Sequence, residues 1–376
     1  MNPIILSDLT FYLFCAITTV QIFFYLFFFS RISFHRNAPA PAAPPEPVAV
    51  SVVICARDEA RNLSARLPSV LEQQYQGPHE VLVVNDNSFD DTKFVLHQMT
   101  GRYPQLKPVE LMQEAKLIPG KKFPLSVGIK TARYEVLVLT DADCTPASSD
   151  WIRKMQEAYR SGTEVVLGYG PYEKRAGLLN RIIRFETFHT ALQYLSFTKA
   201  GMPYMGVGRN LSYKRDLFFR NKGFSGHHHI PSGDDDLFVN TVATARNTRV
   251  TLDEGSFVYS EPKTTWKDWI RQKRRHFTTS RHYKPLHKFL LGLYSGTHFF
   301  FYPLLIAALL TAHDPFYIWA VFGARFLIQG IIFYSGMRKL KEGDLFWLFP
   351  LLDLWQFIYY VIFAPALWKR PEKKWK

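Results

Sequence analysis

Residues 134–144 read YEVLVLTDADC, and this stretch decides the fold. Its apolar, largely β-branched run is typical of a buried strand. Two carboxylates, Asp141 and Asp143, follow the run directly and are separated by one alanine. Such a pair is a weak signal by itself, because aspartates also gather in surface turns. Its position at the tip of a buried strand makes it a candidate ligand-binding pair.

The chain around this stretch alternates between strand-like and helix-like segments. Strands are predicted at 48–56, 80–86, 106–112 and 135–143, with helices at 59–73, 90–99 and 123–132. This alternation is typical of an α/β fold with a mostly parallel, Rossmann-like sheet covered by helices on both faces. Ligands bind such sheets where the strands end at their carboxyl side. Three polar clusters are predicted there: ARDE (56–59), NDNSFDDT (85–92) and TDADC (140–144).

Four apolar segments are long enough to cross a membrane, which takes about 20 residues. The first, at 11–29, has no charge and ends in bulky residues, so we interpret it as an uncleaved anchor rather than a signal peptide. The other three close the chain, at about 290–312, 315–336 and 344–368. The predicted organisation is a transmembrane anchor (1–31), a Pro/Ala linker that holds the next domain off the membrane (32–47), a catalytic-type globular domain (48–262), an amphipathic interface helix (263–287) and a C-terminal transmembrane block with a basic tail (288–376).

The Lys and Arg residues beside these segments indicate their orientation. Arg31 and Arg36 follow the first segment and Arg338 follows the third, whereas the 313–314 connection has neither residue type. Because positive charge marks the cytoplasmic side, we predict an integral protein of the cell's inner membrane with its globular domain in the cytoplasm. The last segment disagrees, since a fourth full span would leave the basic tail outside. It also contains Asp353, and a charge at mid-membrane costs roughly 2.5–3.5 kcal/mol. We expect this segment to re-enter or to lie in the interface.

The net charge of +14, from 46 Lys and Arg against 32 Asp and Glu, favours anionic partners. Nucleotide diphosphates and anionic membrane lipids are the predicted classes. Nucleic acid is not expected, because the sequence contains no helix-turn-helix pattern or aromatic RNA-binding platform. The three cysteines lack paired spacing, so neither a disulfide framework nor a zinc site is indicated.

The carboxylates at the strand ends have a specific chemical use. Hard oxygen ligands suit Mg²⁺ or Mn²⁺, which bind through one or two carboxylates and substrate phosphates. Asp141 and Asp143 are the predicted ligands. Asp86, at the end of another strand, could instead cap the following helix. Because Ser88 or Asp90 can supply that cap, we assign Asp86 to a base or ribose.

Two later stretches carry further candidates. GVGRNLSYKRDLF (206–218) has two glycines beside Arg209, which suggests backbone that approaches a ligand rather than a packed strand. SGDDDLFVN (232–240) places three acids before a helical run. A helix dipole accounts for one or two of them. The third indicates a general base, whose pKa its like-charged neighbours would raise.

WKDWIRQKRRHF (266–277) is amphipathic, with an aromatic face bordered by Lys and Arg. Helices of this kind lie in the membrane interface, and that is our prediction for this one. Arg274 and Arg275 also offer forked donors suited to phosphate oxygens.

The order of these motifs, over roughly 48–285, resembles glycosyltransferase family 2, membrane-bound inverting enzymes of the GT-A fold. VSVVICARDEARNL, VVNDNSFDDT (similar to VDDxSxDxT) and GKKFPLSVGIKTA (similar to GKxxALNxGI) match its nucleotide-binding motifs. TDADC matches its metal motif. The resemblance implies nucleotide contacts at Glu59, Asp86, Lys121 and Asp141, and a metal on Asp141 and Asp143.

Two more motifs complete the resemblance. GDDDL is similar to GEDxxL, which implies a catalytic base at Asp235, with Asp234 in place of the usual Glu. QKRRH is similar to QxxRW, which implies catalytic roles for Gln272 and Arg275. His276 stands where that family has Trp, and this departure argues against a processive polysaccharide synthase.

The resemblance implies an inverting glycosyltransferase that requires Mg²⁺ or Mn²⁺. It would move a sugar from a nucleotide-diphosphate donor, by preference a UDP-sugar, to a lipid or lipid-linked acceptor at the cytoplasmic membrane face. Two alternatives stay open: a processive synthase that extrudes its polymer, and a membrane-anchored nucleotide-sugar binding protein without turnover. A metallohydrolase site at HHH (227–229) is disfavoured, because adjacent histidines on a regular element cannot all face one metal.

Overall fold

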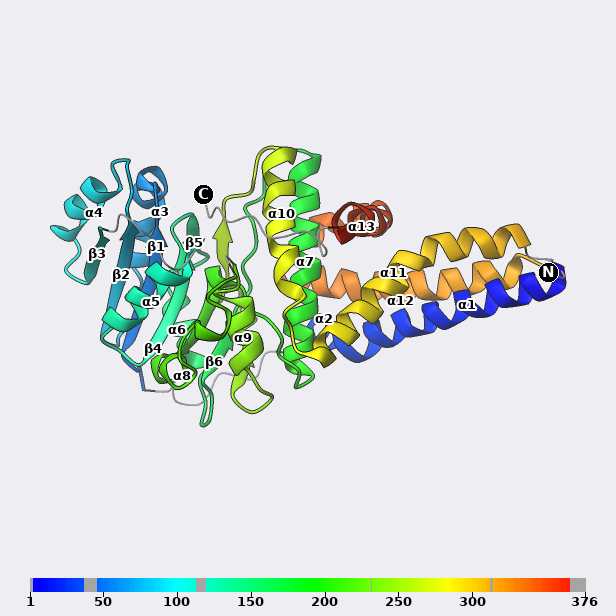
Figure 1. The fold of residues 1–376 in the computed structure, drawn as a ribbon, viewed down its shortest axis with the longest axis horizontal. Helices are drawn as coiled ribbons and strands as arrows, with labels where there is room; N and C mark the ends of the chain where they lie inside the picture. Colours follow the sequence, from blue (N-terminus) through cyan, green and yellow to red (C-terminus); the bar gives the residue numbers. More distant parts are fainter. Residues whose placement is uncertain (1–2, 37–45, 113–119, 231, 312–313, 366–376) are drawn as a thin grey trace.

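The computed structural model describes residues 3–36, 46–112, 120–230, 232–311 and 314–365. Most of the predicted linker (37–45) and the basic tail (366–376) therefore lie outside the described residues. Figure 1 shows an α/β domain at one end and a long arm of helices at the other, with α7 (Leu178–Lys199) and α10 (Trp266–Ser280) between them.

The sheet contains seven strands in the order β3-β2-β1-β4-β7-β6-β8. Strand β7 is antiparallel to both of its neighbours, and the other pairings are parallel. A second, two-stranded sheet pairs β5 with β9. The strands are β1 (Val50–Ala56), β2 (His79–Asp86), β3 (Leu106–Leu111), β4 (Val136–Asp141), β5 (Cys144–Pro146), β6 (Val165–Leu167), β7 (Leu211–Lys214), β8 (Thr248–Val250) and β9 (Val258–Ser260). The predicted α/β class, mostly parallel, is confirmed.

Helices cover both faces of the large sheet because successive side chains of a strand point to opposite sides. Val53 and Cys55 of β1 join a core cluster with α5 and α7, whereas Val52 and Ile54 join a second cluster with α3, α4 and α6. The remaining helices of the domain are α3 (Ala60–Leu71), α4 (Thr92–Thr100), α5 (Lys122–Thr131), α6 (Trp151–Glu157), α8 (Arg215–Arg220) and α9 (Asp236–Val242), with 3₁₀ turns η2 (Gly208–Asn210), η3 (Ser225–His227) and η4 (Glu254–Ser256).

One sequence expectation is wrong in this domain. The stretch 206–218 is expected to approach a ligand rather than to form a packed strand, yet its residues 211–214 form β7, which pairs with β4 on one side and β6 on the other. Leu211 and Tyr213 are fully buried. Gly208 and Arg209 lie in the preceding turn η2.

The helical arm contains α1 (Pro3–Phe23), continued by a π-helix η1 (Phe24–Phe29) and α2 (Ser30–Ser33), and α11 (Pro285–Thr311) and α12 (Phe316–Lys339). These helices run side by side along the long axis of the molecule (Figure 1). Within the described residues, four helical segments are long and apolar enough to cross a membrane by length and composition, the fourth being Gly343–Phe363.

The fourth segment lies differently from the other three. It begins as a 3₁₀ helix η5 (Gly343–Leu348) and continues as α13 (Phe349–Phe363). Figure 1 shows α13 end-on, so it runs across the other three helices rather than along them. That this segment re-enters the membrane or lies in its interface stays a prediction.

The N-terminal helix packs directly on the α/β domain. Phe28 of the π-helix stacks on Phe197 of α7, with ring centroids 4.3 Å apart. Phe24, Tyr25, Phe28 and Phe29 all belong to the largest core cluster, which also contains residues of the central sheet. The helix end and α7 therefore share one apolar core. That the 32–47 linker holds the domain off the membrane stays a prediction.

A buried polar network joins α13 to the arm. Arg325 of α12 and Asp353 of α13 are 0% and 1% exposed, and Arg325 Nη1 lies 2.7 Å from Asp353 Oδ2. Gln329 donates to Asp353 Oδ1 at 2.7 Å, and the Tyr302 hydroxyl donates to Oδ2 at 2.6 Å. Arg325 Nε also donates to Gln21 Oε1 at 2.9 Å. The carboxylate of Asp353, whose charge argues against a full membrane span at 344–368, thus has partners on both of its oxygens.

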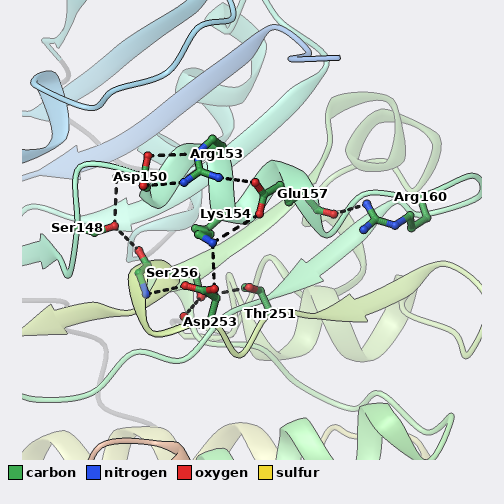
Figure 2. Close-up of polar contacts among 10 residues, drawn as sticks. Ser148, Asp150, Arg153, Lys154, Glu157, Arg160, Thr251, Asp253 and Ser256 are labelled. Atoms are coloured by element: carbon green, nitrogen blue, oxygen red, sulfur yellow. Dashed lines mark hydrogen bonds and ion pairs between the residues drawn. The ribbon is translucent and has the colours of Figure 1, made fainter. Parts of the chain in front are cut away.

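A surface network fixes helix α6 to the turn η4 (Figure 2). Lys154 of α6 lies 3.0 Å from Asp253, and Arg153 contacts both Asp150 and Glu157 at 2.6 Å. On the far side of η4, Lys341, just after α12, pairs with Glu254 at 2.6 Å. The end of α12 therefore lies on the same side of the arm as the α/β domain.

Candidate active site

One cavity of about 1530 Å³ lies at the carboxyl ends of the central strands and continues between α7, α10, α11 and α13. It brings together residues that are far apart in the sequence. Eight of the nine predicted site residues line it: Glu59, Lys121, Asp141, Asp143, Asp234, Asp235, Gln272 and Arg275. Two of the three strand-end clusters, ARDE and TDADC, thus open onto one space together with the DDD loop and α10, whereas no residue of NDNSFDDT (85–92) lines it.

Asp141 ends β4, and Asp143 follows it at the cavity wall. Oxygens of both carboxylates and the Cys144 sulfur lie within 4.8 Å of one another, an arrangement that could hold a metal ion. Burial raises the pKa of the Cys144 thiol well above its usual range, so the thiol stays neutral. Burial, and then the Asp141 charge, also raise the pKa of Asp143. The two carboxylates are therefore the hard oxygen ligands of this group, and their mutual repulsion favours a cation between them.

Two consecutive lysines, Lys121 and Lys122, make different contacts. Lys121 forms a direct ion pair with Asp141 in the cavity. Burial alone would lower the pKa of Lys121, but the Asp141 charge, the charge of Asp234 and the hydrogen bond to Asp141 act together against it, and the pKa is raised. Lys122 is buried and donates to the carbonyls of His227 and Ile230, at 2.6 and 2.8 Å. Lys121 therefore carries charge at the site, while Lys122 holds the loop that precedes the DDD sequence.

Asp235 is the N-cap of helix α9 and also faces the cavity. Its Oδ2 accepts from the Gly208 backbone N–H at 2.7 Å, and its Oδ1 accepts from the Asp236 N–H at 2.8 Å. A Cβ on residue 208 would lie 3.3 Å from Asp235 Oδ2, so glycine allows the close approach of turn η2. The backbone approach predicted for this stretch is thus made to a carboxylate.

The electrostatic setting of Asp235 suits a proton acceptor. Burial, and then the charges of Asp234 and Asp236, raise its pKa to about 7. Asp236 is held by α10 and the turn that follows, because Thr279 and Tyr283 donate to its Oδ2 at 2.5 and 2.8 Å. A carboxylate with a pKa near neutrality can take and release a proton at physiological pH.

Arg209 lines the same cavity and was not among the predicted catalytic residues. Its guanidinium lies 4.3 Å from the centre of the Tyr172 ring, and Gln272 donates to the Tyr172 hydroxyl at 3.3 Å. A Cβ on Gly170 would come within 2.7 Å of the Arg209 side chain, so a glycine there leaves room for it. Arg209 acts electrostatically on both Asp141 and Asp143. The G-x-G-R pattern was the signal that could have identified it.

Two of the residues predicted to contact the nucleotide, Asp86 and Glu59, are buried or already hydrogen-bonded in the structure. Asp86 ends β2 and is fully buried, and it is not among the residues that line the large cavity. Glu59 lines the cavity and accepts from Asn62 at 2.5 Å. The assignments of Asp86 to the base and of Glu59 to the nucleotide stay predictions.

The aromatic face of α10 packs on α13. Trp269 is 1% exposed, and its ring centroid lies 5.5 Å from that of Phe363. Phe277 stacks on the same ring at 5.7 Å. Helix α13 therefore covers part of this aromatic face. That α10 lies in the membrane interface stays a prediction. The side chain of His276 lies outside the described part of the chain.

Lys273, on the same helix, forms a buried pair with Glu186 of α7 at 2.5 Å. The Tyr359 hydroxyl of α13 donates to the other Glu186 oxygen at 3.0 Å. All three side chains line the cavity. They join α7, α10 and α13 at the point where the cavity passes from the α/β domain toward the helical arm.

The metallohydrolase alternative finds no support in the described residues. Among them, the group that could hold a metal consists of Asp141, Asp143 and Cys144, and it contains no histidine. The described cysteines are all free, as the sequence indicated.

Comparisons with known proteins agree with this site. A sequence profile described as Glycosyl transferase family 2 matches residues 51–219, and one described as Glycosyl transferase family group 2 matches residues 136–367. The chain is 30% identical over 192 residues to Glycosyltransferase AglE of Haloferax volcanii, which covers 49% of this chain and 58% of that protein. It is 29% identical over 139 residues to the Beta-monoglucosyldiacylglycerol synthase of Synechocystis sp., covering 36% of this chain and 27% of that one. This chain thus spans less than two thirds of either relative.

Among solved structures, the mannosyltransferase PcManGT from Pyrobaculum calidifontis, in complex with GDP-Man and Mn²⁺, has a similar fold. The TM-score is 0.58 at 18% identity, over 94% of this chain and 99% of that one. The sheet and the matches together define a glycosyltransferase of the GT-A fold. More than half of the chain matches the second profile, and the protein belongs to the family 2 glycosyltransferases. The predicted family and fold are confirmed.

Proposed function

We propose that the protein is an inverting glycosyltransferase that moves one sugar from a nucleotide-diphosphate donor to a lipid or lipid-linked acceptor at the cytoplasmic face of the inner membrane. The observation that carries this proposal is the single cavity. It joins a carboxylate pair, a carboxylate with a pKa near 7 and several cationic side chains to the helices of the membrane arm.

The chain's own residues account for one displacement. Asp235 accepts the proton of the acceptor hydroxyl as that oxygen attacks the anomeric carbon. The bond from this carbon to the diphosphate breaks on the opposite side, which inverts the configuration. Negative charge then grows on the leaving diphosphate, and Arg209, Arg275 and Lys121 are the cationic side chains in the cavity that can stabilise it.

Asp141 and Asp143 fit a divalent cation, Mg²⁺ or Mn²⁺, because they offer paired hard oxygens beside a neutral thiol. When bound, such a cation neutralises charge on the diphosphate. The fold neighbour that was solved with GDP-Man and Mn²⁺ supports this choice of cofactor. We expect a uridine nucleotide as donor, and a guanosine nucleotide is the alternative to test.

The membrane supplies the acceptor in this proposal. The cavity reaches residues of α11 and α13, so a molecule held in the bilayer can enter it from that side. A relative named for the synthesis of monoglucosyldiacylglycerol supports a lipid acceptor. The Lys341–Glu254 pair places the basic end of α12 beside the catalytic domain, and basic flanks favour the cytoplasm.

The test uses the purified full chain in detergent, with radiolabelled UDP- and GDP-sugars and a total lipid extract. We expect label in the organic phase, dependent on a divalent cation. Label in an insoluble polymer would instead identify a processive synthase. Donor binding without transfer to either product would identify a binding protein and would contradict the proposal.

A further inference from the structure

One part of the cavity wall is formed by a face of helix α11. Lys288, Leu291, Gly292 and Ser295 of α11 line it. Their spacing of three and four residues places them on one side of the helix. A Cβ on Gly292 would meet nothing within 4 Å, so this side of α11 borders open space. A chain of lipid could lie along this face.

Two cationic residues line the cavity near the start of α11. Arg281 follows α10 and lines the cavity, and Lys288 lies in the first turn of α11. Among the described residues, no carboxylate forms an ion pair with Lys288 within 4.0 Å. Cations beside the N-terminal end of a long helix favour an anionic group. This part of the cavity therefore suits a lipid whose headgroup carries phosphate.

The surroundings of Asp235 add a second requirement for the acceptor lipid. Thr279 and Tyr283, on either side of Arg281, contact Asp236, which follows the candidate base Asp235. The short segment 279–283 thus connects Arg281 to the region of the candidate base Asp235. A base is useful only if the nucleophile has a proton to lose. A phosphate monoester has its second pKa near 6 and attacks without such help, whereas an alcohol needs it.

We propose, resting on the function proposed above, that the acceptor is an anionic lipid whose headgroup carries both a phosphate and a free alcohol. Arg281 and Lys288 hold the phosphate, and the lipid chain leaves along the α11 face. The alcohol oxygen attacks the anomeric carbon and its proton passes to Asp235. The electron pair of the broken carbon–oxygen bond leaves with the nucleoside diphosphate.

The first test is the chemical nature of the product made from a total lipid extract by the purified full chain in neutral detergent. Mass spectrometry should find phosphorus in the glycosylated lipid, and the sugar should be bound to an alcohol oxygen. A phosphorus-free glycolipid, or a sugar bound to the phosphate itself, would overturn the inference and leave the proposed transferase standing. No glycosylated lipid at all would remove the proposed function, and this inference with it.

The second test is kinetic and uses Lys288→Ala. We expect the lipid concentration that gives half-maximal transfer to rise at least tenfold, while the KM for the donor stays unchanged. Lys288→Arg should restore most of the affinity. The matched control is Lys267→Ala, which removes an exposed lysine of α10 that does not line the cavity.

Neutral detergent separates acceptor recognition from general attraction to an anionic membrane. If Lys288→Ala changes transfer only when phosphate-bearing lipids without a free alcohol are added, Lys288 binds bulk lipid and the inference is overturned. An unchanged half-maximal lipid concentration in Lys288→Ala would overturn it as well.

Discussion

Two regions of this protein bury acidic side chains, and the charges around those side chains are opposite in the two regions. In the membrane arm, Asp353 has an arginine, a glutamine and a tyrosine hydroxyl on its two oxygens. In the catalytic cavity, three consecutive aspartates, residues 234–236, lie together, and the pKa of Asp235 is raised to about 7. The first cluster is matched in charge, whereas the second keeps an excess of like charge.

The difference teaches how to separate structural from chemical carboxylates. A matched buried acid stabilises the fold only through its partners, and loss of one partner leaves a charge unpaired. A crowded acid destabilises the fold slightly but gains a pKa close to neutrality. Substitutions in the two regions should therefore affect different measurements.

The largest expected effect is on turnover. Asp235→Asn keeps the shape but removes the proton acceptor, so kcat should fall by up to about ten-thousandfold. Thermal stability should change far less than kcat, because the variant removes one repelling charge but can accept only one of the two backbone N–H groups that Asp235 accepts. Donor binding measured by calorimetry should persist. A variant that keeps wild-type kcat would show that Asp235 is only a helix cap.

Removal of the cation should come next. One unit charge 4 Å from the leaving oxygen, at an effective dielectric near 20, contributes about 4 kcal/mol. Each 1.36 kcal/mol is tenfold in rate. Chelation should therefore slow transfer on the order of a thousandfold, and Asp143→Ala should be equally slow with or without chelator. Further loss when chelator is added to that variant would place the cation elsewhere.

In the membrane arm, Asp353→Ala should act on stability instead. It leaves the Arg325 guanidinium buried without its carboxylate, which costs about 3–5 kcal/mol. Thermal unfolding in detergent would show this as a lowered midpoint. The double variant Arg325→Met with Asp353→Leu should recover most of the loss. If the double variant is no more stable than the single one, the pair has a role beyond charge matching.

A smaller effect should appear in the pH profile. Because the pKa of Asp235 is raised to about 7, the carboxylate becomes protonated below that pH and can no longer accept a proton. The rate constant for transfer should fall about tenfold per pH unit below 7. Measurement between pH 5 and 8 at saturating donor and lipid checks this. Asp235→Asn should have a flat profile over the same range.

The smallest effect is expected at the surface network of Figure 2. Lys154 contacts Asp253 and Glu157, but all three side chains are partly exposed. Lys154→Ala should change the free energy of unfolding by less than about 1 kcal/mol, and less still at high salt. Chemical denaturation at two salt concentrations would measure it. A loss comparable to that of Asp353→Ala would mean that exposure does not separate the two kinds of ion pair.

Local pattern was enough to predict much of this molecule. The strand that ends at Asp141 follows from its apolar β-branched run, and the parallel sheet follows from the alternation of strands and helices. That topology alone brings Glu59, Lys121 and Asp141 to one edge. The DDD loop and α10 could be placed there only through the family resemblance, because no spacing rule links segments that lie this far after Asp141 in the sequence.

Local pattern could not predict the contacts between distant elements. Burial of Asp86 depends on how its strand packs, and the cover over Trp269 depends on a helix more than 80 residues later. Arg209 needs the space left by Gly170 and the ring of Tyr172, neither of which its own turn contains. In each case the side chain's partner, rather than its own neighbours in sequence, determines its environment.

The stacking of Phe28 on Phe197 also sets a practical boundary for anyone who expresses this protein. A truncated fragment that starts after the Pro/Ala segment would bare the side of α7 that the first helix now shields from water. Each large apolar side chain exposed in this way forfeits roughly 1.5–3 kcal/mol, and several lie at that seam. The α/β domain is therefore not independent of the first helix. A water-soluble version would need polar substitutions on the exposed surface of α7.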